Sequence, residues 1–222
     1  MKLITRSLLQ ILMLLFCVAA NSQPVENPHN EALAAVRAGN LPKLKMLIEQ
    51  HGANMNARNR PGESLLLMAI KAKNKEIALY LLESGANVNV ANTSKVTPLM
   101  AAAFTDDLQM AKKLIEKNAD IHAVDQLKKT AIVYAAGVGA TEIVELLLAK
   151  GVDINARYAN DLTILMWAAG SGHTKTVEAL LARGADPDLV DNRGKNALQM
   201  ADDGGQLDAK KILMEKTKTG NK

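Results

Sequence analysis

A stride of 33 residues runs through the chain and constrains its fold more than any other feature. Steps of that length lead back from Gly184 to Gly151, Asn118, Gly85 and Gly52. Two further sets of residues recur at the same spacing, each at its own position, or phase, within the 33-residue unit. One is the leucines Leu81, Leu114, Leu147, Leu180 and Leu213, and the other is the polar residues Ser64, Thr97, Thr130, Thr163 and Asn196. A repeat of this length predicts an elongated stack in which each copy contacts only its neighbours.

The repeated unit resembles the ankyrin repeat. Its closest local matches are Thr97-Pro98-Leu99-Met100-Ala101-Ala102 and Gly172-His173, and the resemblance covers roughly residues 28 to 217. It implies an all-α ankyrin-repeat solenoid of about six helix pairs joined by β-hairpin loops. Where the family usually has histidine after Thr-Pro-Leu, the chain has Leu67, Met100, Val133, Met166 and Gln199. The family's histidine bonds between repeats should therefore give way to apolar packing.

The repeats divide the chain into segments. We expect a signal peptide over 1–20, a linker over 21–27, a repeat domain over 28–217 and a tail over 218–222. The repeat domain should hold copies at about 28–57, 58–90, 91–123, 124–156, 157–189 and 190–217. Acidic Asp202 and Asp203 stand where earlier copies have Ala, Ile or another small or apolar residue, so the last copy reads as a cap whose surface can meet water.

The N-terminus has the pattern of a secretory leader. Lys2 and Arg6 precede an apolar run from Leu8 to Ala20, which suits a signal peptide and is short for a membrane span. An uncleaved anchor is one alternative. A lipoprotein signal at Cys17 is another, although such sites want a small residue where this chain has Phe16. We therefore expect a periplasmic or secreted protein, without membrane insertion after signal cleavage.

Helix boundaries follow from residue types at fixed phases. The polar residues of the stride, Ser64, Thr97, Thr130, Thr163 and Asn196, can each cap a helix start, worth about 1 kcal/mol apiece. Small residues that let helices approach closely follow at Ala69, Ala102, Ala135, Ala168 and Ala201. Left-handed residues that end the second helices are expected at Gly85, Gly151, Gly184 and Asn118. Tyr158 interrupts the Asn or Asp found at the hairpin turns of the other copies.

Composition argues against chemistry. Without Lys2 and Arg6, the chain has 25 basic and 23 acidic residues, so its net charge is close to neutral. This gives little reason to expect nucleic acid or anionic lipid as the partner. The only cysteine lies in the leader, so the mature chain has no thiol. The histidines His29, His51, His122 and His173 fall at different phases of four copies and should not converge on a metal. We expect no cofactor, no metal and no enzymatic activity.

What remains is a surface for a partner. In the ankyrin family, partners usually dock on the concave side, which is formed by hairpin tips and first helices. Four of the five aromatic residues of the mature chain lie there, and aromatic anchors dominate interface energetics. Tyr134 and Trp167, which share a phase, could instead pack between neighbouring first helices. The expected partner-binding residues are Phe104, Tyr134, Trp167, Tyr158, Val96, Leu127, Leu162, Arg60, Lys129, Asn160 and Arg193.

These observations favour an exported, non-catalytic scaffold, monomeric before binding, that recognises another envelope protein. An alternative is an inhibitor or self-protection protein for an exported enzyme such as a cell-wall hydrolase, because a rigid concave scaffold can occlude a cleft without doing chemistry.

Overall fold

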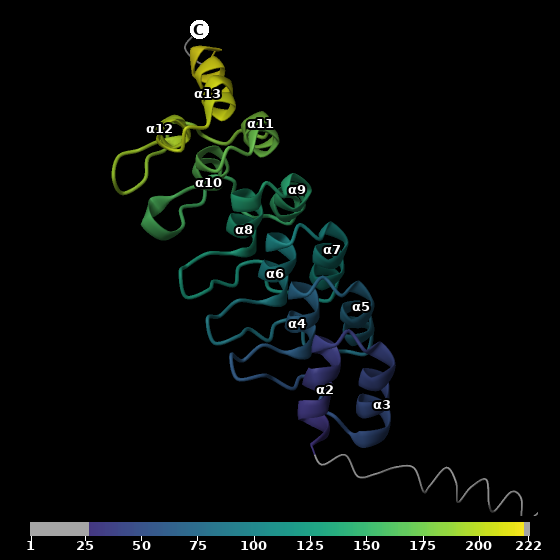
Figure 1. The fold of residues 1–222 in the computed structure, drawn as a ribbon. Coiled ribbons are helices and arrows are strands. Elements are labelled where there is room, and N and C mark those ends of the chain that lie inside the picture. Colours follow the sequence, from purple (N-terminus) through teal and green to yellow (C-terminus); the bar gives the residue numbers. More distant parts are fainter. Residues whose placement is uncertain (1–26, 220–222) are drawn as a thin grey trace, which may run out of the picture.

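A computed structural model describes residues 27–219 (Figure 1). The predicted leader and most of the predicted linker lie outside these residues. Twelve α-helices follow one another in the described part, arranged as six consecutive pairs. The pairs are α2 (Pro28–Arg37) with α3 (Leu41–His51), α4 (Leu65–Lys71) with α5 (Lys75–Glu83), α6 (Pro98–Phe104) with α7 (Leu108–Glu116), α8 (Ala131–Val138) with α9 (Thr141–Ala149), α10 (Ile164–Gly170) with α11 (Thr174–Ala182), and α12 (Ala197–Asp203) with α13 (Leu207–Thr219).

The pairs stack into a solenoid, as the 33-residue stride predicts. The first helices, from α2 to α12, form one row, and the second helices, from α3 to α13, form another (Figure 1). Each first helix packs on the next first helix along the whole stack. The all-α solenoid of helix pairs is therefore confirmed.

Five loops join successive pairs and stand out from the row of first helices (Figure 1). We number them loop 1 (52–64), loop 2 (84–97), loop 3 (117–130), loop 4 (150–163) and loop 5 (183–196). Each turns back on itself and is closed by a backbone hydrogen bond four residues apart, such as Asn59 N–H to Glu63 O at 3.0 Å. In the described residues these hairpins contain no strand, only an isolated bridge between Arg58 and Ser64.

The caps follow the sequence pattern at four of five positions. Ser64, Thr97, Thr163 and Asn196 accept a hydrogen bond from the amide three residues on, at 3.0 to 3.3 Å. The expectation is wrong at Thr130. Its backbone is extended like the others, but its buried hydroxyl makes no such bond, so α8 begins without a side-chain cap.

The core lies between the two rows of helices. The five phase-matched alanines Ala69, Ala102, Ala135, Ala168 and Ala201 are all fully buried, which brings the first helices close together. Gly85, Gly151, Gly184 and Asn118 adopt left-handed backbone conformations after the second helices, as predicted. No helix in the described part of the chain has both the length and the apolar character needed to cross a bilayer.

Candidate protein-binding face

The surface formed by the loops and the exposed side of the first helices is called the inner face below. Two phases of the stride project onto it from the first helices. One phase holds Met68, Ala101, Tyr134, Trp167 and Met200, and the other holds Lys71, Phe104, Gly137, Gly170 and Asp203. In these two phases the middle copies carry aromatic, apolar or small residues, and charge appears only at Lys71 and Asp203.

Phe104 and Tyr134 form an aromatic pair in the middle of the inner face. Their ring centroids are 6.1 Å apart and the rings are nearly perpendicular, a favoured edge-to-face arrangement. Phe104 is 60% exposed although it is a large apolar side chain. Such exposure is unfavourable in isolation and is typical of surfaces that a partner covers.

Lys129, at the end of loop 3, reaches across to the next copy. Its ammonium lies 4.4 Å from the centroid of the Trp167 ring and 5.9 Å from that of Tyr134. Both distances suit a cation–π interaction. Within residues 27–216, whose side chains the structure describes, no carboxylate lies within ion-pair distance of this ammonium. Lys129 is therefore a partly covered cation without an ion-pair partner among these side chains.

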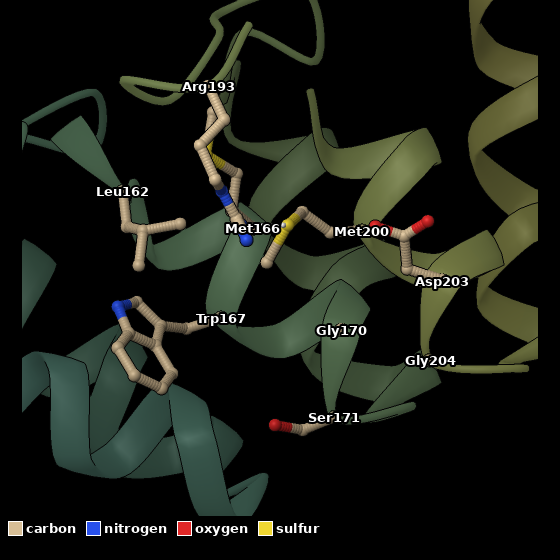
Figure 2. Close-up of a pocket in the computed structure, with 9 residues that line it drawn as sticks. All are labelled: Leu162, Met166, Trp167, Gly170, Ser171, Arg193, Met200, Asp203 and Gly204. Atoms are coloured by element: carbon tan, nitrogen blue, oxygen red, sulfur yellow. Dashed lines mark hydrogen bonds between the residues drawn. The ribbon is translucent and has the colours of Figure 1, made fainter. Parts of the chain in front are cut away.

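Two pockets flank this lysine-aromatic cluster. The first has a volume of about 240 Å³ and is lined mainly by Val96, Met100, Phe104 and Tyr134. The second has a volume of about 340 Å³, and Figure 2 shows Leu162 and Trp167 on one side of it and Met200 and Asp203 of α12 on the other. Both pockets are large enough for an apolar side chain and lie where the loops meet the first helices.

An ion pair lies near each end of the inner face. Glu63 of loop 1 pairs with Lys71 of α4, and Lys195 of loop 5 pairs with Asp203 of α12. These pairs occupy the same two phases of the stride with the signs reversed. Burial raises the pKa of Glu63, but hydrogen bonds from Lys71 and Asn59 outweigh it and leave the pKa below its usual value. Lys71 and Asp203 are therefore each neutralised within their own copy.

Two loop aspartates organise the turns below these side chains. Asp125 Oδ1 accepts hydrogen bonds from the amides of Leu127 and Lys129, and its Oδ2 accepts the Tyr134 hydroxyl at 2.6 Å. The equivalent Asp191 binds its own loop amides in the same way, but its Oδ2 accepts the Arg193 guanidinium at 2.8 Å. The hydroxyl of Tyr134 thus stabilises the turn of loop 3, while its ring forms part of the wall of the first pocket.

The other predicted binding residues divide by exposure. Leu127 is 65% exposed at the tip of loop 3, and Arg60 and Asn160 are exposed at the tips of loops 1 and 4. Val96 and Leu162 are half-buried and line the first and second pocket. Arg193 lines the second pocket while paired with Asp191.

Tyr158 is half-buried and packs against the core, and burial is the main cause that raises its pKa. The methionines of the pocket walls, Met100, Met166 and Met200, did not enter the predicted set. Their recurrence near one phase was the signal that could have indicated them.

Histidine and acidic side chains have structural contacts instead of forming a reactive cluster. His173 Nε2 lies 3.0 Å from the carbonyl oxygen of Gly137 in the preceding copy, and His29 Nδ1 accepts the amide of Asn54. Among the described residues, no group of three or more His, Cys, Asp or Glu side chains is arranged to hold a metal ion. The His173 contact also shows that one histidine bond does join two copies, although from a different phase than the family's usual one.

Comparison with protein families agrees with this geometry. A model described as ankyrin repeats (3 copies) matches the chain in five overlapping registers, over residues 7–92, 32–125, 66–158, 106–191 and 132–222. Together these matches cover well over half of the sequence, so the chain belongs to the ankyrin repeat family. No curated protein matches it significantly. Membership of this family makes the protein a scaffold for binding another protein.

Proposed function

We propose that the protein is an exported, non-catalytic scaffold that recognises another envelope protein through its inner face, which is the concave side predicted from the sequence. The observation that carries the proposal is the exposure of Phe104 and Leu127, both large apolar residues more than half exposed on this face. Few buried contacts hold them, so they add little to folding, whereas a partner that covers them gains apolar burial of about 25 cal/mol per Å².

Export is supported by the sequence of the leader, in which two basic residues precede an apolar run. Fractionation of host cells that produce the full chain tests it. The expected result is a shortened protein in the envelope or the medium. A shortened protein in the cytoplasm would contradict the envelope part of the proposal and leave the binding part intact.

Binding is tested by two substitutions and a matched control. Phe104→Ala and Leu127→Ala each remove an exposed apolar side chain from the inner face. Leu207→Ala does the same at α13, where Leu207 is 76% exposed in the row of second helices. We expect all three variants to melt within a few degrees of the parent, since surface changes usually alter stability by less than about 0.5 kcal/mol.

Partner capture from envelope extract, read by mass spectrometry, should then separate the variants. Capture should fall for the Phe104 and Leu127 variants and persist for the Leu207 variant. Unfolding of both inner-face variants would instead assign the two side chains to core packing. One stoichiometric hydrolase whose activity falls on binding would make the protein an inhibitor, whereas several unrelated partners would make it a general scaffold.

A further inference from the structure

The loops of the solenoid are joined to one another by regular hydrogen bonds. At the tips, one backbone bond of 3.0 Å links loop 1 to loop 2, loop 2 to loop 3, and loop 4 to loop 5. The donors and acceptors are Thr93 to Pro61, Gln126 to Ser94, and Asn192 to Asn160. Between loop 3 and loop 4, all of whose residues the structure describes, the corresponding bond is missing.

The bases of the loops show the same interruption. An asparagine Oδ1 accepts the amide of the next loop at 2.9 Å between loops 1 and 2, 2 and 3, and 4 and 5. These asparagines are Asn56, Asn89 and Asn155. His122 occupies the equivalent phase in loop 3, and no such bond links it to loop 4. Both rows of loop-to-loop hydrogen bonds therefore stop at one place, which we call the seam.

The structure of loop 4 accounts for the interruption at the tips. Tyr158 stands where the other loops have Asn or Asp, so the side-chain bond that shapes those turns is absent. Residues Ala159–Asp161 form a short 3-10 turn, with Asn160 and Asp161 both in left-handed conformations. The tip of loop 4 therefore differs in shape from that of loop 3, and the two tips do not match.

The helices on either side of the seam are nevertheless firmly joined. His173 contacts the Gly137 carbonyl, the hydroxyls of Thr141 and Thr176 are 2.8 Å apart, and Arg183 pairs with Glu145 at 3.0 Å. The stack is thus continuous at its helices, and the two regular rows of hydrogen bonds are interrupted only on the loop side. Lys129, Tyr134 and Trp167 lie at this open side, with one of the two pockets on each side of them.

We propose, building on the inner-face function above, that the seam is the centre of the partner footprint. It takes a protein segment that carries an Asp or Glu side chain between two large apolar side chains. The carboxylate would lie against the Lys129 ammonium, which has two aromatic faces and, among the described side chains, no carboxylate within ion-pair distance. The apolar side chains would enter the two pockets. Nucleic acid fits less well, because its backbone requires several converging cations, whereas among the described residues Lys129 is the cation that lies over these two rings.

The probe is a displayed library of random peptides of about 12 residues, selected on the immobilised full chain; a segment of that length is extended enough to span two neighbouring pockets. The expected result is a shared motif with a carboxylate flanked on both sides by large apolar residues. Selection on Lys129→Glu should replace the carboxylate by Lys or Arg at the same position of the motif. A motif without a carboxylate on the parent chain, or enrichment of nothing, overturns the inference.

Affinity measurements on one selected peptide complete the test. Lys129→Met keeps the alkyl stem against the rings and removes the charge, and it should bind about tenfold more weakly, as expected for an interface hot spot. Lys112→Glu, an exposed lysine of α7 in the outer row, changes net charge twice as much and should bind like the parent. Equal affinity of the parent and Lys129→Met overturns the inference.

The two proposals fail in different ways. If selected peptides lack the acidic residue but lose affinity on Phe104→Ala, the seam motif is wrong and the inner-face function stands. If Phe104→Ala, Leu127→Ala and Lys129→Met all leave both peptide binding and envelope-partner capture unchanged, both proposals are overturned. Thermal melts of each variant establish that it is folded.

Discussion

The hydroxyl of Tyr134 donates a 2.6 Å hydrogen bond to Asp125, and the ring of the same tyrosine packs edge to face against Phe104. One side chain on α8 therefore fixes the turn of loop 3 and forms a wall of the first pocket. The Lys129 backbone amide donates to the same aspartate, so the turn that holds the lysine near Trp167 depends on this carboxylate.

Replacing Tyr134 by phenylalanine should lower stability in a pH-dependent way. Burial, and then the hydrogen bond and charge of Asp125, raise the pKa of Tyr134 to about 12 from 10.0. A raised folded-state pKa means that this stability is fully present below pH 10 and is lost as pH rises toward 12. Tyr134→Phe should cost about 1 to 2 kcal/mol near neutral pH.

Urea unfolding of the parent and Tyr134→Phe, from neutral pH to above pH 10, measures this. The difference between their free energies of unfolding should shrink across that window. Tyr80→Phe is the comparison. Burial and Glu49 also raise the pKa of Tyr80, but its hydroxyl makes a longer, exposed bond of 3.1 Å to Glu49, so we expect a smaller effect of the same sign. A pH-independent difference would show that the Asp125 bond does not contribute through the ionisation of Tyr134.

Asp191 should give the last copy an acid-sensitive step. The amide of Lys195 is the largest cause that lowers its pKa below 3.8, with further lowering from Arg193. A lowered folded-state pKa gives stability that is present above pH 3.8 and lost as pH falls through the folded pKa. Asp191→Asn keeps the Oδ1 acceptor but removes the charge. The difference in free energy of unfolding between the parent and this variant should therefore shrink as the pH is lowered.

Amide hydrogen exchange of α12 and α13 at neutral and acid pH, combined with thermal melts, measures this gap. Asp161→Asn removes another loop carboxylate that is exposed in loop 4, and it serves as the matched control. A gap between the parent and Asp191→Asn that persists at acid pH would contradict the assignment.

Two threonines in the same phase should respond differently to substitution. Thr97 caps α6 through a 3.3 Å bond to the Met100 amide, whereas the Thr130 hydroxyl caps nothing. Thr97→Ala should therefore cost about 1 kcal/mol, and Thr130→Ala clearly less. Chemical denaturation of the two variants measures the difference, and equal losses would mean that the α6 cap contributes nothing of its own.

Two glycines of the fourth copy should separate backbone strain from crowding. Gly139 and Gly151 both have positive φ, but a Cβ at Gly139 would lie 2.6 Å from the His173 ring, and one at Gly151 would meet nothing within 4 Å. Gly151→Ala should cost about 1 to 2 kcal/mol from the left-handed backbone alone. Gly139→Ala should cost roughly 1 to 3 kcal/mol more because the histidine must move.

Free energies of unfolding of the two alanine variants measure this difference. The double variant Gly139→Ala with His173→Ala provides the control, since removing the ring should recover the crowding part of the loss. Equal destabilisation by Gly139→Ala and Gly151→Ala would show that the close approach of His173 has no energetic consequence.

The repeat period was sufficient to predict the helix pairs, because each cap, core alanine and left-handed glycine depends on contacts within one copy or with its neighbour. The replacement of asparagine by tyrosine at position 158 was visible as well. Its result, a 3-10 turn at which the regular hydrogen bonds between loops 3 and 4 are interrupted, was not predictable, because it depends on how two differently shaped turns face each other.

The binding face was only partly predictable. Phe104, Leu127, Lys129 and Trp167 were identified from their phases, but the placement of Lys129 over the Trp167 ring joins residues from different copies and required the structure. The terminal ion pairs could have been found, since Glu63 with Lys71 and Lys195 with Asp203 share a separation of eight residues.

The sign-reversed ion pairs Glu63–Lys71 and Lys195–Asp203 limit the charge contacts that a bound molecule can gain on the inner face. A ligand that used its own charges to bind Lys71 or Asp203 would have to break an internal charge pair to make a new one, with little net gain in water. A partner of the proposed kind would therefore select this solenoid by its charge at Lys129, between the two pairs, and not at Lys71 or Asp203.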